Sequence, residues 1–475
     1  MLELSSSRKN KVNLSDYPCQ QDIDHRIMLA DFTAFEHRVL EEILFSPLKM
    51  SLRKLSKSLD CADHNTLPVL QKLAAAGLLS IEGDTLLIDK EMRKYFEFQT
   101  SRFDEEFKPD MEFLQGLLRK VPIHVLPTWY AIPRTSSNIF ESILEKYLLS
   151  PQIFLRYLAE LHIGNTKMNA LVQEVFSSPQ LQIPSSDLIA KYNIDRREFE
   201  EMILWLEFNF VCCLTYKKED DHWIEFVSPF YEWRQYLLFL QETNPPAVPT
   251  EKIASLREGD FAFVEDITII LQETKKEPIS LDSWNSNCLI PPEATRFLSS
   301  LIGLRPLTEL SIAQQYLTQA IRKICLVHLA QVIDGHLHAT EMAKDWLQLS
   351  VENKASYLHR HPCNHIISFP IPSHLNTEKC IHEAEKTIKR VEDGRWVYVE
   401  DLIKGSLASF DEQSTIVLRK TGKTWRYNLP QYQPEQKLLI KAVIIEWLFE
   451  AGMVSLGTIG GQDCFRVTPF GRCFF

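Results

Sequence analysis

Residues 67–88 read LPVLQKLAAAGLLSIEGDTLLI, and the prediction of the fold begins with this stretch. Apolar residues recur at helical spacing from Leu67 to Leu73. Gly77 follows them, and glycine commonly ends a helix because it adopts a positive φ at no steric cost. Two short apolar runs then flank residues 82–84, whose sequence Glu-Gly-Asp is typical of a hairpin turn. The stretch therefore predicts a helix followed directly by a two-stranded hairpin.

Two further helices are predicted before this stretch. Between Phe35 and Leu44 apolar side chains repeat every three or four residues. A shorter run begins after Ser51, a residue type that caps helix N-termini. Three helices followed by a hairpin form a winged helix, which is a helix-turn-helix with a β wing. Residues 31–100 are therefore predicted to be a winged-helix-like module.

The same order returns later in the chain, without a fixed repeat length. The predicted fold class is mainly α with small β-hairpins (α+β), built from tandem winged-helix-like domains. Asn244 to Pro249 contain three prolines and are expected to be a linker, because proline cannot continue a helix. Phe261 to Leu271 are expected to be strand-like. The expected domains are a flexible N-terminus (1–30), a first winged-helix-like module (31–100), a helical segment with a second module (101–243), a third module with a strand segment (250–355) and a C-terminal module (376–475).

The composition limits the kind of partner. The chain has 475 residues, too many for one hydrophobic core, and 45% of them are hydrophobic, an ordinary value for globular proteins. Its 15 glycines are few, which disfavours Gly-rich phosphate loops. A net charge of −11 repels nucleic acid, because Lys and Arg must replace the counterions of the phosphates. Any nucleic-acid site must therefore be a local basic patch.

Cysteine usage and hydropathy indicate a cytoplasmic protein. The ten cysteines show no CxxC spacing, so reduced thiols are expected. Met1 to Asn13 are polar and are not expected to be a secretory signal. The most apolar late stretch, Ala442 to Leu456, is interrupted by Glu446 and Glu450, and no membrane association is expected.

The C-terminal half resembles a known family. Trp447 to Gly457 (WLFEAGMVSLG), followed by Phe465 to Arg472 (FRVTPFGR), is similar to the winged-helix ending of bacterial XPB-type helicase-associated proteins. Gly394 to Val397 and Ala339 to Leu349 add to the resemblance, which covers roughly residues 250 to 475. The resemblance implies DNA transactions beside a helicase motor. No Walker A loop or acidic helicase box is found in this sequence, so a helicase would act in trans.

Two basic groups are the candidate nucleic-acid contacts. Each lies on a predicted helix or wing, where cations reach a phosphate backbone. The first group is Lys49, Arg53, Lys54 and Lys57, with Lys72 on the predicted recognition helix; the second is Arg419, Lys420, Lys423 and Arg426, with Trp425 interleaved. The commoner alternative for the second group is a solvated hairpin with buried aromatic side chains. The second module is a poor DNA reader, because its predicted helix carries Asp195, Glu198, Glu200 and Glu201.

Enzyme signatures are weak, and no catalytic residue, metal or cofactor is expected. Gly422-Lys423-Thr424 resembles the end of a phosphate loop, but Val417 stands where the loop needs glycine. A crowded group of metal-ligating residue types comprises His359, His361, Cys363 and His365, with Cys380 and His382 later. Alternate residues on a strand point to opposite faces, which disfavours a zinc site there.

Three functional hypotheses follow. The favoured one is a non-enzymatic accessory factor that binds double-stranded DNA, or a DNA-processing complex, through local basic patches. The alternative is a protein-interaction scaffold without nucleic-acid binding, for which the acidic balance is suited. The third is a metal hydrolase at residues 359–365. No small-molecule substrate is predicted.

Overall fold

The computed structural model describes residues 18–60, 63–120, 139–161, 163–281, 288–304, 309–360, 366–422 and 424–475. They are mainly helical, with small antiparallel sheets of two or three strands, which confirms the predicted class of mainly α with small β-hairpins (α+β). The chain divides into two compact units. Unit 1 comprises residues 1–238 and 417–427, and unit 2 comprises residues 239–416 and 428–475.

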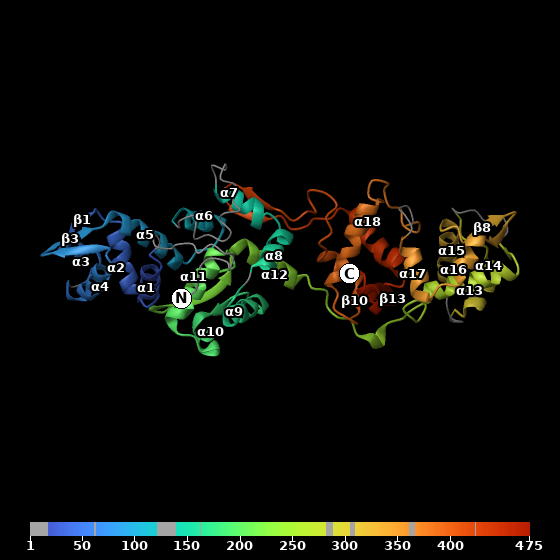
Figure 1. The fold of residues 1–475 in the computed structure, drawn as a ribbon, viewed down its shortest axis with the longest axis horizontal. Coiled ribbons are helices and arrows are strands. Elements are labelled where there is room, and N and C mark those ends of the chain that lie inside the picture. Colours follow the sequence, from blue (N-terminus) through green and yellow to red (C-terminus); the bar gives the residue numbers. More distant parts are fainter. Residues whose placement is uncertain are drawn as a thin grey trace. The chain divides into compact units, whose positions relative to one another are not determined.

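The first module of unit 1 spans residues 34–100 (blue in Figure 1). Its elements are α2 (Ala34–Leu44), β1 (Lys49–Ser51), α3 (Leu52–Ser58), α4 (Asp63–Ala75), β2 (Leu79–Glu82), β3 (Thr85–Ile88) and α5 (Lys90–Thr100). Strand β3 lies between β1 and β2 and pairs antiparallel with both. Gly77 has a φ of +77°, as its position after α4 requires. The three helices and the hairpin predicted here are confirmed.

The second module spans residues 166–242 and repeats this order. It contains α9 (Thr166–Ser177), β4 (Ile183–Pro184), α10 (Ser185–Tyr192), α11 (Arg196–Phe208), β5 (Cys212–Glu219), β6 (His222–Pro229) and α12 (Tyr231–Glu242). Its strand order, β4-β6-β5, matches that of the first module. Asp195 caps α11 by accepting a hydrogen bond from the Arg197 amide, at 3.0 Å.

Further helices complete unit 1. They are α1 (Cys19–Ala30), η1 (Ser101–Phe103), α6 (Met111–Lys120), α7 (Ile139–Ile143), the π-helical segment η4 (Leu144–Leu148) and α8 (Pro151–Glu160). The segment 1–30 was expected to be a flexible N-terminus. In its described part, α1 is a regular helix that packs against α11 and buries Ile23 and Leu29.

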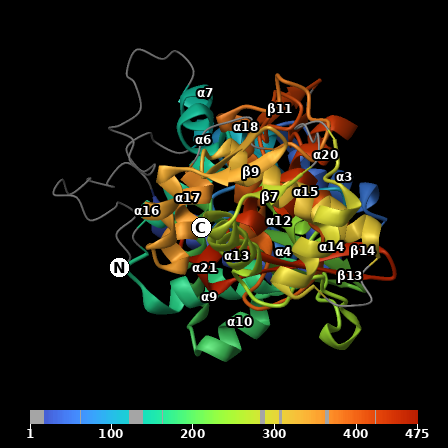
Figure 2. The ribbon, with the colours of Figure 1, turned by 90° about the vertical axis from the view of Figure 1, so that its right-hand side faces the viewer.

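The third module, residues 262–360, belongs to unit 2. It contains α13 (Ala262–Lys276), β7 (Ile279–Ser280), α14 (Pro292–Ile302), α15 (Leu310–Leu326), β8 (Ala330–Ile333), β9 (His336–Ala339), α16 (Glu341–Leu347) and α17 (Val351–Arg360). Helices α13, α14 and α15 pack against one another, and all three are labelled in Figure 2. The strand expected over Phe261–Leu271 is wrong. That segment is α13, because Phe263, Ile267 and Ile270 lie on one buried helical face despite their high strand propensity.

The fourth module spans residues 378–472. It contains α18 (Glu378–Glu385), η6 (Lys386–Arg390), β10 (Val397–Tyr398), α19 (Val399–Lys404), α20 (Pro434–Ala442), the π-helical segment η7 (Val443–Leu448), β13 (Val454–Ile459), β14 (Gln462–Val467) and α21 (Pro469–Arg472). The strand order is β10-β14-β13, as in the other modules. A short helix, η5 (Thr250–Lys252), precedes the third module, and Ala254 beyond it pairs with Thr458 of β13.

A hairpin between α19 and α20 lies within the predicted C-terminal module 376–475 and is grouped with unit 1. Strands β11 (Leu418–Thr421) and β12 (Thr424–Tyr427) belong to unit 1, so they are not the wing of the fourth module. Two hydrogen bonds hold them there: Tyr427 Oη donates to the Leu148 carbonyl and the Leu418 amide donates to the Leu149 carbonyl, each at 2.8 Å. The wing of the fourth module is the hairpin β13–β14. We refer to β11 and β12 as the basic ribbon.

Candidate functional site

The first predicted basic group lies on the surface of the first module. Lys49 comes from β1, and Arg53, Lys54 and Lys57 come from α3; all four side chains are exposed. Arg53 and Lys57 are four residues apart and therefore share one side of the helix, where their like charges repel. We refer to these four residues as the α3 basic face.

One residue of this group, Arg53, forms a weak ion pair with Asp84. The Arg53 Nε atom is 4.0 Å from Asp84 Oδ2, and both side chains are more than half exposed, so solvent screens the pair. Within the described ranges, no ion pair is found for Lys49, Lys54 or Lys57. The α3 basic face thus keeps its charge.

Lys72, predicted as a nucleic-acid contact, is engaged inside the module. Its Nζ atom lies 2.6 Å from Glu36 Oε1 and 5.5 Å from the centre of the Phe32 ring. Burial by itself would raise the pKa of Glu36, but the Lys72 ammonium and the Thr33 amide hold it below its ordinary value. Lys72 therefore neutralises a carboxylate of its own module.

Helix α4 carries two exposed side-chain amides, those of Asn65 and Gln71, and α3 packs against this helix. The two amides are six residues apart and therefore lie on different sides of α4. Side-chain amides of this kind form paired hydrogen bonds with the edge of adenine in the major groove. The first module thus carries exposed amides on α4 and exposed cations on α3, the helix that packs against it.

The basic ribbon places two arginines directly opposite each other. Arg419 on β11 is the cross-strand partner of Arg426 on β12, and both side chains are exposed. Like charges in directly opposed positions repel each other across a strand pair. Lys420 lies over the Trp425 ring at 5.8 Å. Lys423, also predicted here, lies outside the described residues.

Trp425 is less available than predicted. It is half-buried, and its ring packs edge-on against Phe140, with 5.9 Å between the ring centres. The stacking of a nucleic-acid base on Trp425 would therefore compete with a contact inside unit 1. The expected interleaving of cations and aromatic side chains is present, but the aromatic side chains mainly anchor the ribbon.

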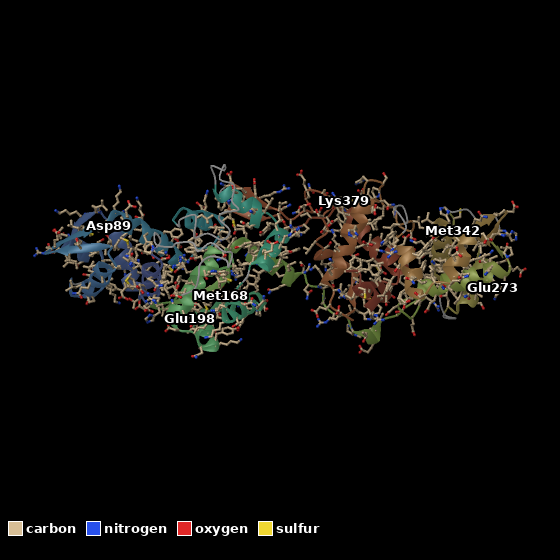
Figure 3. All side chains as sticks on the ribbon, viewed as in Figure 1. Asp89, Met168, Glu198, Glu273, Met342 and Lys379 are labelled. Carbon is tan, nitrogen blue, oxygen red and sulfur yellow. The ribbon has the colours of Figure 1, made fainter. Side chains whose placement is uncertain are left out.

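The third helix of the second module is buried. Glu200 and Glu207 on α11 are fully buried, and Glu198 is half-buried. Figure 3 labels Glu198 on this helix. Glu207 accepts hydrogen bonds from Arg102 and from Arg26 of α1. Burial would raise the pKa of Glu207, but the two guanidiniums lower it to about 2. Helix α11 therefore packs within unit 1 and does not present a DNA-reading face.

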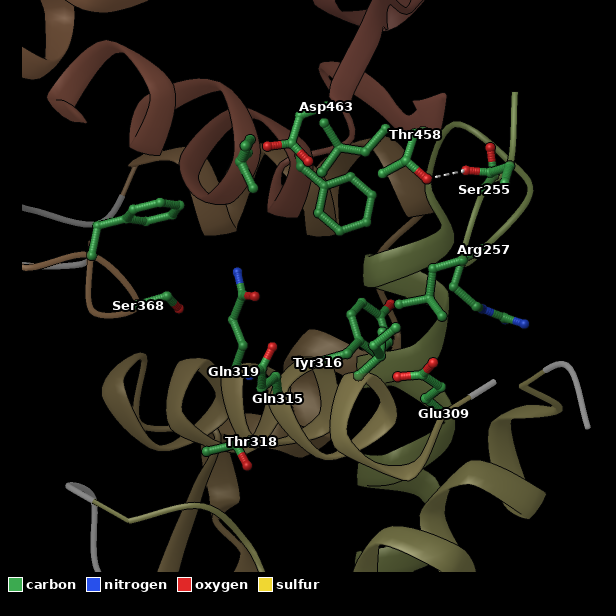
Figure 4. Close-up of a pocket in the computed structure, with 18 of the residues that line it drawn as sticks. Ser255, Arg257, Glu309, Gln315, Tyr316, Thr318, Gln319, Ser368, Thr458 and Asp463 are labelled. Atoms are coloured by element: carbon green, nitrogen blue, oxygen red, sulfur yellow. Dashed lines mark hydrogen bonds between the residues drawn. The ribbon is translucent and has the colours of Figure 1, made fainter. Parts of the chain in front are cut away.

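Sequence reasoning did not find a cleft that lies within unit 2. It has a volume of about 880 Å³ and separates α15 of the third module from η7 and β13 of the fourth. Figure 4 shows Gln315, Tyr316 and Gln319 of α15 facing Thr458 and Asp463. We refer to it as the unit 2 cleft. A cavity of this size with mixed apolar and polar walls is a typical binding site.

Buried charges lie beside the unit 2 cleft. Lys323 Nζ is 2.5 Å from Glu450 Oε2, and Gln319 donates to Glu450 Oε1 at 2.7 Å. Glu446 accepts hydrogen bonds from the amides of Ile367 and Ser368, at 2.7 and 3.0 Å. Burial, together with the neighbouring Glu450, raises the pKa of Glu446 to about 7. Glu446 and Glu450, two acidic residues in an otherwise apolar helix, are the feature of the sequence that could have indicated this site.

The predicted metal cluster is only partly within the described residues, since His361, Cys363 and His365 lie outside them. His359 and His382 both contact the Glu385 carboxylate, at 2.7 and 3.0 Å, and Trp447 Nε1 donates to it at 2.6 Å. Among the residues that the structure describes, no group of three or more His, Cys, Asp or Glu side chains is arranged to hold a metal ion.

Comparisons with known proteins leave the family open. No protein-family model matches the chain, and no curated protein shows significant similarity to it. The resemblance to helicase-associated proteins therefore stays a prediction. In the described ranges, no helix is long and apolar enough to cross a membrane.

Proposed function

We propose that this chain is a non-enzymatic accessory factor that binds double-stranded DNA through the first module. The observation that carries the proposal is the α3 basic face beside the exposed amides of Asn65 and Gln71 on α4. In helix-turn-helix proteins the recognition helix reads base edges while the preceding helix crosses the phosphate backbone. Here α4 would take the first role and α3 the second.

The net charge of −11 determines which surfaces can contact DNA and how strongly the binding depends on salt. Most of the surface repels a polyanion, so only the basic faces would contact it. The four cations of the α3 basic face would contribute about −3.6 to the logarithmic slope of affinity against salt. This contribution alone lowers the affinity roughly 150-fold between about 50 mM and about 200 mM salt.

The basic ribbon supports the proposal as a second phosphate contact. Arg419 and Arg426 face each other on the exposed side of β11–β12 and attract a phosphate group between them. The ribbon is anchored by Tyr427 and Leu418, which face the body of unit 1. A rigid anchor reduces the entropy cost of placing the two arginines on a ligand.

The test compares two variants of equal charge. Lys49, Arg53, Lys54 and Lys57 are changed to Ala in one variant, and the exposed lysines Lys217, Lys218, Lys275 and Lys276 are changed to Ala in the other. Binding to a labelled duplex of about 30 base pairs at low salt is measured by fluorescence anisotropy. The proposal expects loss of binding in the first variant alone. Equal affinity of the two variants would contradict it.

A protein-interaction scaffold is the second candidate function. The observation that favours it is the inward packing of third helices: α11 is buried, and α15 holds the fourth module through Lys323 and Glu450. A helix used for packing cannot enter a DNA groove. No binding of the wild-type chain to DNA, even at low salt, would leave this candidate as the better account.

A cytoplasmic location is part of the proposal. It is supported by the neighbouring cysteines Cys212 and Cys213, which are buried and free. Burial raises the pKa of both thiols well above the ordinary value, so they are unreactive. They act as small apolar side chains in the core of the second module.

A further inference from the structure

We propose that the unit 2 cleft binds an extended peptide segment of a partner protein, which adds a strand to the outer edge of β13. The inference does not depend on DNA binding by the first module. It rests on an open sheet edge, on apolar walls and on a guanidinium nitrogen without an acceptor, each of which lies within unit 2.

The outer edge of β13 is only partly used by the chain itself. On one side β13 pairs with β14 along its length. On the other side Ala254 and Thr458 exchange two hydrogen bonds of 2.9 Å each. The hydrogen-bonding groups of a strand alternate in direction, so those of Leu456 point the same way as those of Thr458. In the described part of the chain they have no partner on that side, and Leu456 lines the cleft.

The edge is therefore a template for another strand. Open strand edges pair readily with extended peptides, and main-chain hydrogen bonds then give affinity. The Ala254–Thr458 pair is antiparallel and shows that this edge accepts a strand in that orientation. A peptide alongside Leu456 would continue the same edge into the cleft.

The walls of the cleft suit a strand with apolar side chains at alternate positions. Phe449 and Phe369 line the cleft together with Leu289 and Ile312, and the last two are 48% and 46% exposed. Exposed aliphatic side chains at the rim of a cleft lose contact with water when a ligand covers them. Gln315 and Gln319 supply amide groups on the same wall (Figure 4).

One polar group indicates the charge of the peptide. Arg322 lines the cleft, and its Nη2 atom donates to the Cys288 carbonyl at 3.2 Å. Its Nε atom is shielded from water and has no acceptor among the described residues. The other arginine of the cleft, Arg257, is already paired with Asp266. A carboxylate on the peptide would supply the missing acceptor to Arg322.

The cleft also contains acidic groups that limit where this carboxylate sits. Glu309 lines the cleft and is exposed, and Asp463 is paired with Lys441 at 2.7 Å. A peptide with many acidic residues would be repelled by Glu309. The inferred partner segment is therefore mainly apolar, with one carboxylate at the position of Arg322.

The experiment uses the full-length chain and a phage-displayed library of random dodecapeptides. Peptides enriched on the wild-type chain are synthesised with a fluorescent label and measured against Gln315→Trp, which fills the cleft, and Arg322→Gln. The inference expects alternating apolar residues with one Asp or Glu. It also expects roughly tenfold or greater losses of affinity in both variants. Methylation of alternate peptide amides should abolish binding, because it removes the main-chain donors.

Three results would overturn the inference. The first is no enrichment on the wild-type chain above Gln315→Trp. The second is a set of peptides whose affinity is the same for both proteins. The third is a dimer of the wild-type chain that Gln315→Trp dissociates, which would assign the cleft to a second copy. Circular dichroism of both variants distinguishes a lost site from a lost fold, and DNA binding by the same samples is scored separately.

Discussion

The Lys323 ammonium and the Glu450 carboxylate form an ion pair of 2.5 Å in which both side chains are 1% exposed. The pair joins α15 of the third module to the helical stretch of the fourth module that contains η7 and continues to Glu450. Gln319 donates a hydrogen bond to Oε1, the other oxygen of the same carboxylate. Each of these buried charges is stabilised by the other, because water does not reach them and, among the described residues, neither has a second ion partner as close.

Replacing Lys323 alone should therefore damage unit 2. Lys323→Met leaves Glu450 buried without its counter-charge, and the free energy of unfolding should fall by about 3–5 kcal/mol. The double variant Lys323→Met, Glu450→Met should recover most of that loss, because an apolar pair needs no desolvation of charge. Urea titration followed by circular dichroism measures both. A double variant as unstable as the single one would show that the charge pair is not the cause.

Glu446 should make unit 2 less stable as the pH rises through 7. Its pKa in the folded chain is raised to about 7, so between pH 4.5 and 7 the folded state binds more protons than the unfolded state. Stability is then highest below this window and decreases through it. Glu446→Gln should remove this decrease, which amounts to about 3 kcal/mol, and should be the more stable protein at pH 8. Parallel stability curves for the two proteins from pH 5 to pH 8 would refute this origin.

Glu207 should have the opposite effect on the pH dependence of stability, making unit 1 less stable as the pH falls. Because its pKa is lowered to about 2, its contribution to stability is present above the ordinary glutamate pKa and is lost as the pH falls toward 2. Glu207→Gln removes the carboxylate that Arg102 and Arg26 share, although Arg26 keeps Asp22 at 3.5 Å, and should cost about 3–5 kcal/mol at pH 7. The exposed control Glu219→Gln should change stability by less than about 0.5 kcal/mol. Thermal unfolding of both variants compares them directly.

The basic ribbon should contribute to DNA binding separately from the α3 basic face. Removing two phosphate contacts by changing Arg419 and Arg426 to Ala should reduce the salt slope by about 1.8. The fold of unit 1 should be unchanged, since both side chains are exposed and the anchors Tyr427 and Leu418 remain. An unchanged salt slope would remove the ribbon from the interface.

The local elements were predictable because their signals lie within short segments. Gly77 ends α4 and the hairpin follows it, as its neighbours indicate. Phe261–Leu271 misled the prediction, because β-branched residues at helical spacing satisfy both patterns in part. The segment is helical because α14 and α15 pack against α13 and bury one face of it, and this packing is not visible in the local sequence.

Long-range partners could not be predicted from one sequence. The pairing of β11 with β12 is local, but Tyr427 bonds to Leu148, 279 residues away in the chain. Lys72 was predicted as a phosphate contact because its partner Glu36 lies on another helix, 36 residues away. The unit 2 cleft has walls from several distant segments, so no local pattern marks it.

The most direct test of DNA binding by the first module is the salt dependence of the affinity for duplex DNA, measured for the wild-type chain and for the variant without the α3 basic face. The account predicts a logarithmic slope that becomes less steep by about 3.6 in the variant, since four cations no longer release counterions. Equal slopes for the two proteins, or no binding of the wild-type chain at low salt, would contradict it.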